Sequence, residues 1–308
     1  MGMKTIIHSL FLVSILGCSS SVSQEMKIAP PADFNGYWYA GEAEITSYEL
    51  EQARYGEIHK GTSVLVFVTE PFSKRKQVKL DNWRDQSEDN VSVLKLNMTK
   101  KFLTGIYPYS MMMSTFKPVS TNIHPKTFKV TTSSQEWCGH TFMQANLDQG
   151  KYRLRGYSYF ESEGDVDEMV KEVVLEDELW TTIRLGPELL PTGSVELLPA
   201  TFYLRLRHNE IKPKNAKLTL TSVSNSDFAE RPHWEYEISY ADRQLTVYFE
   251  EAFPYGILGW QETYASGFGN SGRLTTKAKR INTIKSPYWG KNSNADRKIR
   301  KELGLSVE

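Results

Sequence analysis

The chain has 308 residues, with 37 basic and 37 acidic side chains and a formal net charge of zero. A neutral chain has no net field that attracts polyanions, so nucleic acid is not an expected partner. Of its two cysteines, Cys18 lies in an N-terminal signal and only Cys138 remains for the folded part. No intramolecular disulfide is therefore expected.

The N-terminus has the features of a bacterial lipoprotein signal. A Lys-led apolar stretch at residues 6–15 is too short to cross a bilayer, which needs about 20 apolar residues, and its layout is that of a cleaved export signal. It runs directly into Leu16-Gly17-Cys18, which makes Cys18 the predicted lipidation site. We expect a signal peptide at 1–17, a lipidated tether at 18–33, and a location at the cell envelope, on the outer membrane.

Beyond the tether, apolar and polar residues alternate with period two, which is typical of strands with one buried face. Hairpins are predicted at Asp148-Gln149-Gly150, between strands at 137–145 and 152–160, and at 241–244. The apolar run Val64–Val68 predicts a strand covered on both faces. The alternation of Phe202, Leu204 and Leu206 predicts another strand. About ten to fourteen strands favour an all-β, mainly antiparallel fold with a strongly curved sheet or half-barrel.

Two segments break the strand pattern. Apolar residues spaced four apart, ended by Gly186-Pro187, predict a short helix at 176–185 that plugs or braces the sheet. Asn294 as a cap and Gly304 as a stop predict a helix at 295–303. Prolines at 187, 191 and 199 mark the candidate boundary between two β-rich halves. The expected organisation is an N-terminal half at 34–190, a C-terminal half at 191–290 and a basic tail at 291–308.

Charged residues are unevenly distributed. Nine acids within 161–178 predict a solvated acidic edge, and ten bases within 271–301 predict a solvated basic tail. The alternative for the tail is contact with lipid headgroups near the anchor. The segment Gly267–Gly272 matches the dinucleotide-binding glycine pattern, but the residues that follow it read as a strand. Because that pattern works only when a helix follows, we interpret it as a hairpin loop.

Cys138 and His140 are the best local candidates for reactivity. Two residues apart on a strand, they lie on one face, and a cysteine nucleophile needs a nearby base. The simpler interpretation is a buried thiol with a structural role; catalysis and metal or redox sensing remain alternatives. The other histidines lack paired spacing, so neither a metal nor a cofactor is predicted.

Glu42 and Glu44 lie beside aromatic residues, and paired carboxylates in such surroundings are what a glycosidase uses. Their alternation with Ala43 and Ile45 favours instead glutamates that point outward into solvent. No Gly-x-Ser-x-Gly elbow, His-Glu-x-x-His helix or Walker loop is present. An enzyme is therefore not the favoured class.

Aromatic residues and the run Met111-Met112-Met113 are the remaining chemical resource. Such side chains line apolar ligand cavities, and they also fill ordinary β-sheet cores. For the cavity interpretation, the candidate ligand-binding residues are Trp38, Tyr109, Met112, Tyr255 and Trp260.

The segments 36–48, 135–140 and 253–260 resemble an uncharacterised lipoprotein family of Bacteroidota, and the likeness covers nearly the whole mature chain. Members have carried the label "septum formation inhibitor Maf", a name of cytosolic nucleotide pyrophosphatases with an N-terminal Ser-x-Ser-Pro-Arg-Arg signature. That signature is absent here, so the activity is not expected. In layout the chain is similar to open half-barrels that carry lipoproteins or lipids across the periplasm.

The favoured hypothesis is a non-enzymatic, lipid-anchored envelope protein. Its curved β-sheet holds an apolar ligand, such as a lipid or a lipoprotein, or an envelope partner. One alternative is an envelope hydrolase or thiol-dependent enzyme centred on Cys138 and His140. Another is a structural or assembly lipoprotein.

Overall fold

The computed structural model describes residues 1–2, 33–84, 86–267 and 272–306. Nearly all of the predicted signal peptide and tether, with Cys18, lies outside the described residues, as does the centre of the Gly267–Gly272 loop. The strand predicted after that loop is confirmed by β16. Within the described ranges, no helix combines the length and the apolar character needed to cross a membrane.

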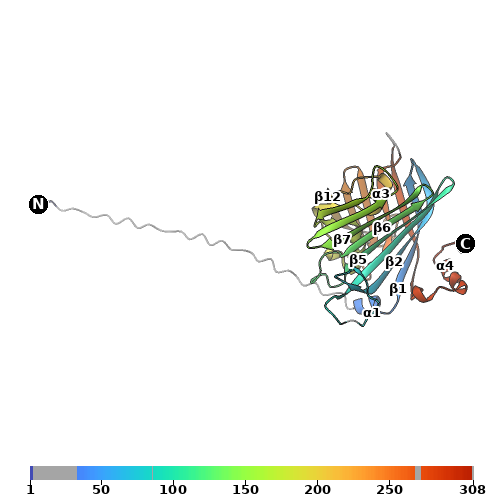
Figure 1. The fold of residues 1–308 in the computed structure, drawn as a ribbon, viewed down its shortest axis with the longest axis horizontal. Coiled ribbons are helices and arrows are strands. Elements are labelled where there is room, and N and C mark those ends of the chain that lie inside the picture. Colours follow the sequence, from blue (N-terminus) through green and yellow to red (C-terminus); the bar gives the residue numbers. More distant parts are fainter. Residues whose placement is uncertain (3–32, 85, 268–271, 307–308) are drawn as a thin grey trace.

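One curved, unclosed and mainly antiparallel sheet organises the described chain (Figure 1), which confirms the predicted all-β fold. Its strand order is β10-β11-β12-β13-β14-β15-β16-β1-β2-β4-β5-β6-β7-β8-β9, with β3 paired to β2. The pairing of β10 with β11 is parallel. The strands are β1 (Ala43–Arg54), β2 (Glu57–Ser73), β3 (Val78–Lys79), β4 (Asn90–Thr104), β5 (Tyr107–Pro118), β6 (Lys129–Glu136), β7 (Gly139–Asp148), β8 (Lys151–Ser158), β9 (Val166–Lys171), β10 (Val174–Leu175), β11 (Gly193–Leu198), β12 (Lys214–Val223), β13 (His233–Tyr240), β14 (Arg243–Glu250), β15 (Ile257–Ala265) and β16 (Arg273–Ser286).

Strands from both ends of the chain meet in this sheet, because β16 pairs with β1 along most of its length. The two predicted hairpins form, β7 with β8 and β13 with β14. Between β7 and β8, Gln149 and Gly150 both have positive φ (47° and 76°), which a two-residue hairpin turn matched to the sheet twist requires.

Two short helices occupy the concave face of the sheet. The 3-10 turn η1 (Glu176–Glu178) and α2 (Leu179–Leu185) confirm the predicted helix at 176–185. The strand predicted at 202–206 was wrong, because these residues form α3 (Thr201–Arg207). All of α2, and all of α3 except Arg205 and Arg207, is buried. In α3 the apolar residues alternate with period two, so the helical period that marks an amphipathic helix is missing from its sequence.

The main core lies between these helices and the inner face of the sheet. Trp180 of α2 contacts Trp260 of β15 edge to face, with ring centroids 5.3 Å apart. Tyr203 of α3 contacts Tyr264 of β15 in the same way at 5.5 Å. The chain's own side chains therefore fill most of the concave face that the sequence suggested as a ligand cavity.

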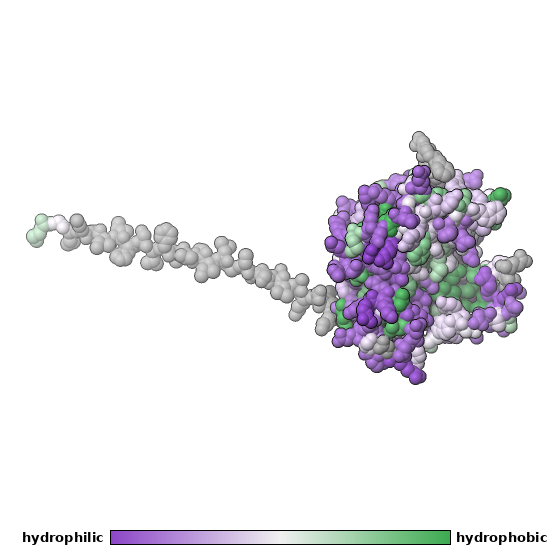
Figure 2. Space-filling model, viewed as in Figure 1, coloured by the Kyte–Doolittle hydropathy of each residue, from purple (hydrophilic) through white to green (hydrophobic). Residues whose placement is uncertain are grey.

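The C-terminal segment covers part of the outer face. Leu303 packs there with Ile45, Val64 and Val66, and Figure 2 shows apolar residues in a hollow beside this segment. Because Leu65 and Phe67 face the main core, the prediction that residues 64–68 are covered on both faces is confirmed.

The N-cap of the C-terminal helical segment is Ser293 rather than the predicted Asn294. The remaining helical elements are α1 (Phe34–Trp38), η2 (Pro187–Leu189), η3 (Tyr288–Gly290), η4 (Asn294–Arg297) and α4 (Lys298–Glu302).

Glu44 does not point into solvent, as its alternation predicted, but is buried and bound to Arg184 of α2. Arg184 donates to both carboxylate oxygens at 2.5 Å. The Tyr37 hydroxyl also donates to Glu44. Burial acts to raise the pKa of Glu44, but the charge and hydrogen bonds of Arg184 outweigh it and lower the pKa overall. This pair ties the internal helix to β1.

The acidic segment is solvated only in part, because Glu176, Asp177 and Glu178 are buried. Arg243 of β14 lies 2.7 Å from Glu176 and 2.8 Å from Glu262 of β15. Glu176 and Glu178 are thus paired in the core with bases of the sheet, since Lys117 of β5 lies 3.2 Å from Glu178. Asp177 instead accepts a hydrogen bond from the Thr201 amide.

Asp177 makes the stability of the folded protein depend on pH. Burial raises its pKa to about 7, so the folded protein holds a proton that the unfolded chain releases near pH 4. The stabilisation from this proton is complete below about pH 4 and is lost as the pH rises through 7, with a loss of about 2–3 kcal/mol between pH 5 and pH 8. We expect Asp177→Asn, which keeps an acceptor for the Thr201 amide, to remove this part of the pH dependence.

The measurement is urea unfolding of both proteins at pH 5 and pH 8. The variant should gain stability relative to the wild type at pH 8. An equal loss at both pH values would instead show that the ionised carboxylate stabilises the core.

Candidate ligand-binding pocket

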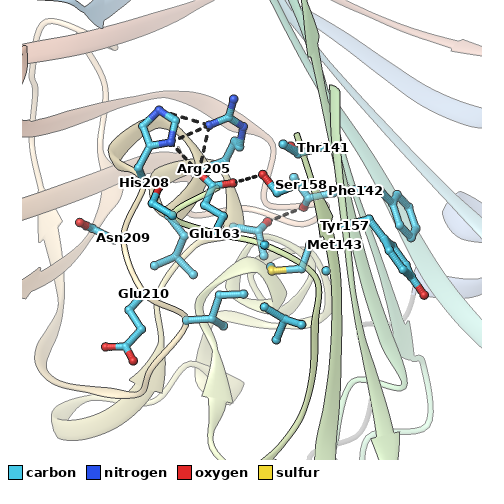
Figure 3. A pocket seen from close by; sticks show the side chains of 18 of the residues that line it. Thr141, Phe142, Met143, Tyr157, Ser158, Glu163, Arg205, His208, Asn209 and Glu210 are labelled. Atoms are coloured by element: carbon cyan, nitrogen blue, oxygen red, sulfur yellow. Dashed lines mark hydrogen bonds and ion pairs between the residues drawn. The ribbon is translucent and has the colours of Figure 1, made fainter. Parts of the chain in front are cut away.

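The two edge regions of the sheet approach each other without closing it. Near the end of β9, Lys171 forms an ion pair with Glu196 of β11 at 2.6 Å. Near the beginning of β9, the inner faces of β6, β7 and β8 diverge from α3 and leave a pocket of about 390 Å³ (Figure 3). This volume lies at the lower end of the usual range for small-molecule sites, about 300–1,000 Å³.

The pocket exists because the inward-facing residues are small at this end of the strands. Thr141, Gly156 and Ser158 line it, whereas Tyr152 and Leu154, further along the same inner face of β8, are fully buried in the core. Gly156 lies opposite Met143 of β7 and Val166 of β9. A Cβ atom there would meet Val166 at 3.6 Å, an ordinary contact, so the backbone accepts a side chain that the pocket could hold.

The opposite wall comes from α3 and the residues after it. Leu204 and Ile211 are apolar, and together with Met143 and Val166 they give the pocket an apolar part. The rings of Phe142 and Tyr157 point away from the pocket, on the other side of their strands (Figure 3). The pocket is therefore apolar on one side without being lined by aromatic rings.

A polar cluster closes the other side of the pocket. His208 has φ 51° at the C-cap of α3, and its Nδ1 lies 2.5 Å from Glu163 Oε1. Arg205 reaches the same oxygen at 3.4 Å, and Ser158 donates to Oε2 at 2.5 Å. Burial acts to raise the pKa of Glu163, but His208, Ser158 and Arg205 outweigh it and lower the pKa overall. The cluster thus holds a carboxylate between two bases.

This cluster lacks the geometry of nucleophilic catalysis. The Ser158 hydroxyl donates to Glu163, and no hydrogen bond joins it to His208, whereas a serine nucleophile needs a base at its hydroxyl. Within the described part of the chain, no group of three or more His, Cys, Asp or Glu side chains is arranged to hold a metal ion. The arrangement suits binding of a ligand with one polar end.

Cys138 and His140 lie outside this pocket, at the tip of the β6–β7 hairpin. Cys138 is exposed, so the expectation of a buried thiol was wrong; it lies in a turn rather than on a strand. Hydrogen bonding to Glu136, together with the charge of that carboxylate, raises the pKa of the Cys138 thiol. This environment disfavours the thiolate that a reactive cysteine needs.

The five candidate ligand residues do not come together at one pocket. Trp38, Tyr109 and Trp260 are core residues with at most 2% of their surface exposed. Met112 is exposed on the outer face of β5, and Tyr255 packs edge to face against Phe253. Trp260 borders a cavity of about 20 Å³, which has room for a water molecule and not for a larger ligand.

Sequence reasoning missed the pocket because its residues come from distant segments and are individually unremarkable in type. Ser158 ends β8 and Glu163 lies in the loop that follows. Arg205 lies on a helix that the sequence presented as a strand, and His208 is the C-cap of that helix. The one local signal is Gly156, a glycine inside an alternating strand, which often marks a site where a ligand or another backbone approaches closely.

The described chain is thus an open, curved, mainly antiparallel sheet with internal helices and a pocket at its seam. No protein-family model and no curated protein matches the sequence. Among solved structures, the chain is similar to a beta-barrel-like protein of domain of unknown function DUF1849 from Brucella abortus. The TM-score is 0.46 and the sequence identity 9%, with 79% of this chain and 97% of that chain covered.

Proposed function

We propose that this protein is a non-enzymatic, lipid-anchored cell-envelope protein that binds a small amphipathic ligand in the pocket between β7–β9 and α3. The observation that carries the proposal is the pocket of about 390 Å³, which has an apolar wall on one side and the Glu163–His208–Arg205 cluster on the other. The anchor and the envelope location rest on the sequence around Cys18.

The packing of the remaining concave face supports this choice of site. Since α2 and α3 fill the centre of the sheet, a ligand needs the space that these helices leave at the seam. The pocket combines the features expected of ligand sites, which are concavity, apolar lining and a few convergent polar groups. Catalysis is not part of the proposal, because the cluster does not pair a nucleophile with a base.

The test is native mass spectrometry of the chain from Ser19 to Glu308, purified from a bacterial cell envelope. We expect the wild type to retain a mass of lipid-like size. Gly156→Leu should abolish this mass, because its side chain projects into the pocket while its Cβ makes only an ordinary contact. Tyr157→Leu, one residue along on the opposite face of β8, is the matched control and should retain the ligand.

Two outcomes would count against the proposal. If the wild type shows only the mass of the protein itself, it retains no ligand. Retention of the ligand by Gly156→Leu, with folding confirmed by circular dichroism, would place the ligand somewhere other than this pocket.

A further inference from the structure

We propose that the ligand is a single-chain amphiphile with an anionic head, a carboxylate or a phosphate, that binds to Arg205 and His208. This inference rests on the proposed function, since it names the ligand class of the same pocket. It starts from the hydrogen bonding of Arg205, which is incomplete in the described structure.

The side chain of Arg205 is a largely buried cation with few acceptors. It is 8% exposed, and its carboxylate contact, to Glu163 Oε1, is 3.4 Å long. Charge-assisted hydrogen bonds are usually about 2.7–2.9 Å long. The Nε atom is buried and has no hydrogen-bond partner among the described residues. Burial lowers the pKa of Arg205 because desolvation penalises its charge, and the charge of Glu163 offsets this only in part.

The guanidinium therefore has donors left for a second anion. Figure 3 shows one terminal nitrogen directed at Glu163 and His208 and the other directed away from them. A guanidinium edge binds two oxygens of a carboxylate or a phosphate side by side, which makes these the matching head groups. The His208 ring lies 3.2 Å from Arg205 and is exposed, and its Nδ1 is bonded to Glu163, so its Nε2 is the atom that would donate to the same anion when it carries a proton.

A cationic head fits this end of the pocket less well. Glu163 is the acid there, and His208, Arg205 and Ser158 already donate to its two oxygens. The other acids that line the pocket, Glu168 and Glu210, are exposed at its rim, and Glu210 is paired with Lys212. Solvent and salt screen exposed charges of this kind, so they oppose an anion only weakly.

The pocket volume limits the apolar part of the ligand. About 390 Å³ must hold both the head and the chain, which suits one alkyl chain rather than two. That chain would lie against Met143, Leu204 and Ile211, the apolar residues across from the cluster. Burial of these methylene groups supplies affinity, and the cluster supplies selectivity for the head.

The test compares decanoate, decyl phosphate and neutral decyl maltoside, each below its micelle-forming concentration, by isothermal titration calorimetry on the chain from Ser19 to Glu308. We expect one or both anions to bind at least tenfold more tightly than decyl maltoside. The tighter of the two identifies a carboxylate or a phosphate head.

Three variants test the contacts to the anionic head group separately from binding of the apolar chain in the pocket. His208→Gln, at an exposed position, should weaken anion binding by about threefold to tenfold and leave decyl maltoside unchanged. Glu163→Gln should strengthen anion binding, since it removes the resident carboxylate that competes for both bases. Arg205→Gln should abolish the preference for anions, and His208→Gln keeps the test valid if this buried substitution impairs folding.

The outcomes distinguish this inference from the proposed function. Equal affinity for charged and neutral heads, abolished by Gly156→Leu, would overturn the anionic head and leave the pocket as the ligand site. Failure of all three amphiphiles to bind the wild type would overturn both.

Discussion

Glu44→Gln is expected to destabilise the protein by about 3–5 kcal/mol, because it leaves the guanidinium of Arg184 buried without its anionic partner. Arg184 is 1% exposed and makes two charge-assisted hydrogen bonds to Glu44. It also lies over the rings of Trp38 and Phe67, at 5.1 and 4.8 Å from their centroids. Loss of the carboxylate therefore loosens the contact of α2 with β1 and α1 together.

A double-mutant cycle checks this explanation. Breaking a buried ion pair costs more than replacing both partners with apolar residues, so Glu44→Leu with Arg184→Met should recover most of the loss. Urea unfolding of the single and double variants gives the coupling energy. A double variant as unstable as the sum of the single variants would contradict the account.

The exposed ion pair between Arg153 and Asp167 is the matched control. It has a comparable bidentate geometry at 2.7 Å, but both side chains are substantially exposed. Exposed pairs are worth about 0–1 kcal/mol, so Asp167→Asn should have a small effect.

Trp260→Ala is expected to cost about 3–5 kcal/mol of stability, the usual range for removing a large aromatic side chain from a packed core. The Trp260 ring contacts Tyr48 at 4.9 Å and Trp180 at 5.3 Å, so it joins β1, β15 and the internal helix α2. Its substitution should lower the thermal midpoint, and ligand loss should appear only as a consequence of unfolding. Differential scanning calorimetry measures this effect.

Met112→Ala is the control for this prediction. Met112 was a candidate ligand residue on the same grounds as Trp260, yet it is 39% exposed on the outer face of β5. Its substitution should change stability by less than about 0.5 kcal/mol. Comparable losses for both variants would contradict the division into core and surface.

Strands were predictable because their alternation reflects one buried and one exposed face. The hairpin of β13 and β14 follows directly from Trp234–Tyr240 and Leu245–Phe249. The helix α2 was predictable from its spacing and its glycine–proline stop, although it is buried all round. The helix α3 was not, because Phe202, Leu204 and Leu206 alternate with a tyrosine and two arginines, and this period-two pattern mimics a strand.

Individual charged and reactive side chains were harder to place. Glu44 and Glu176 read as solvated acids, because their partners Arg184 and Arg243 lie 140 and 67 positions away in the sequence. Long-range ion pairs of this kind leave no local pattern. The pocket cluster has the same origin, since Glu163 and His208 meet only when α3 lies against the loop after β8.

Methionine methyl NMR tests the central claim, a ligand pocket at the seam of an otherwise filled sheet, most directly. Met143 lines the pocket, Met98 and Met113 are buried in the core, and Met112 is on the outer face. During titration of a labelled chain with decanoate, we expect the Met143 methyl signal to shift with saturation while the other three stay in place. Saturable shifts at Met98 or Met113 without one at Met143 would contradict the account and place the ligand in the core between the sheet and its internal helices.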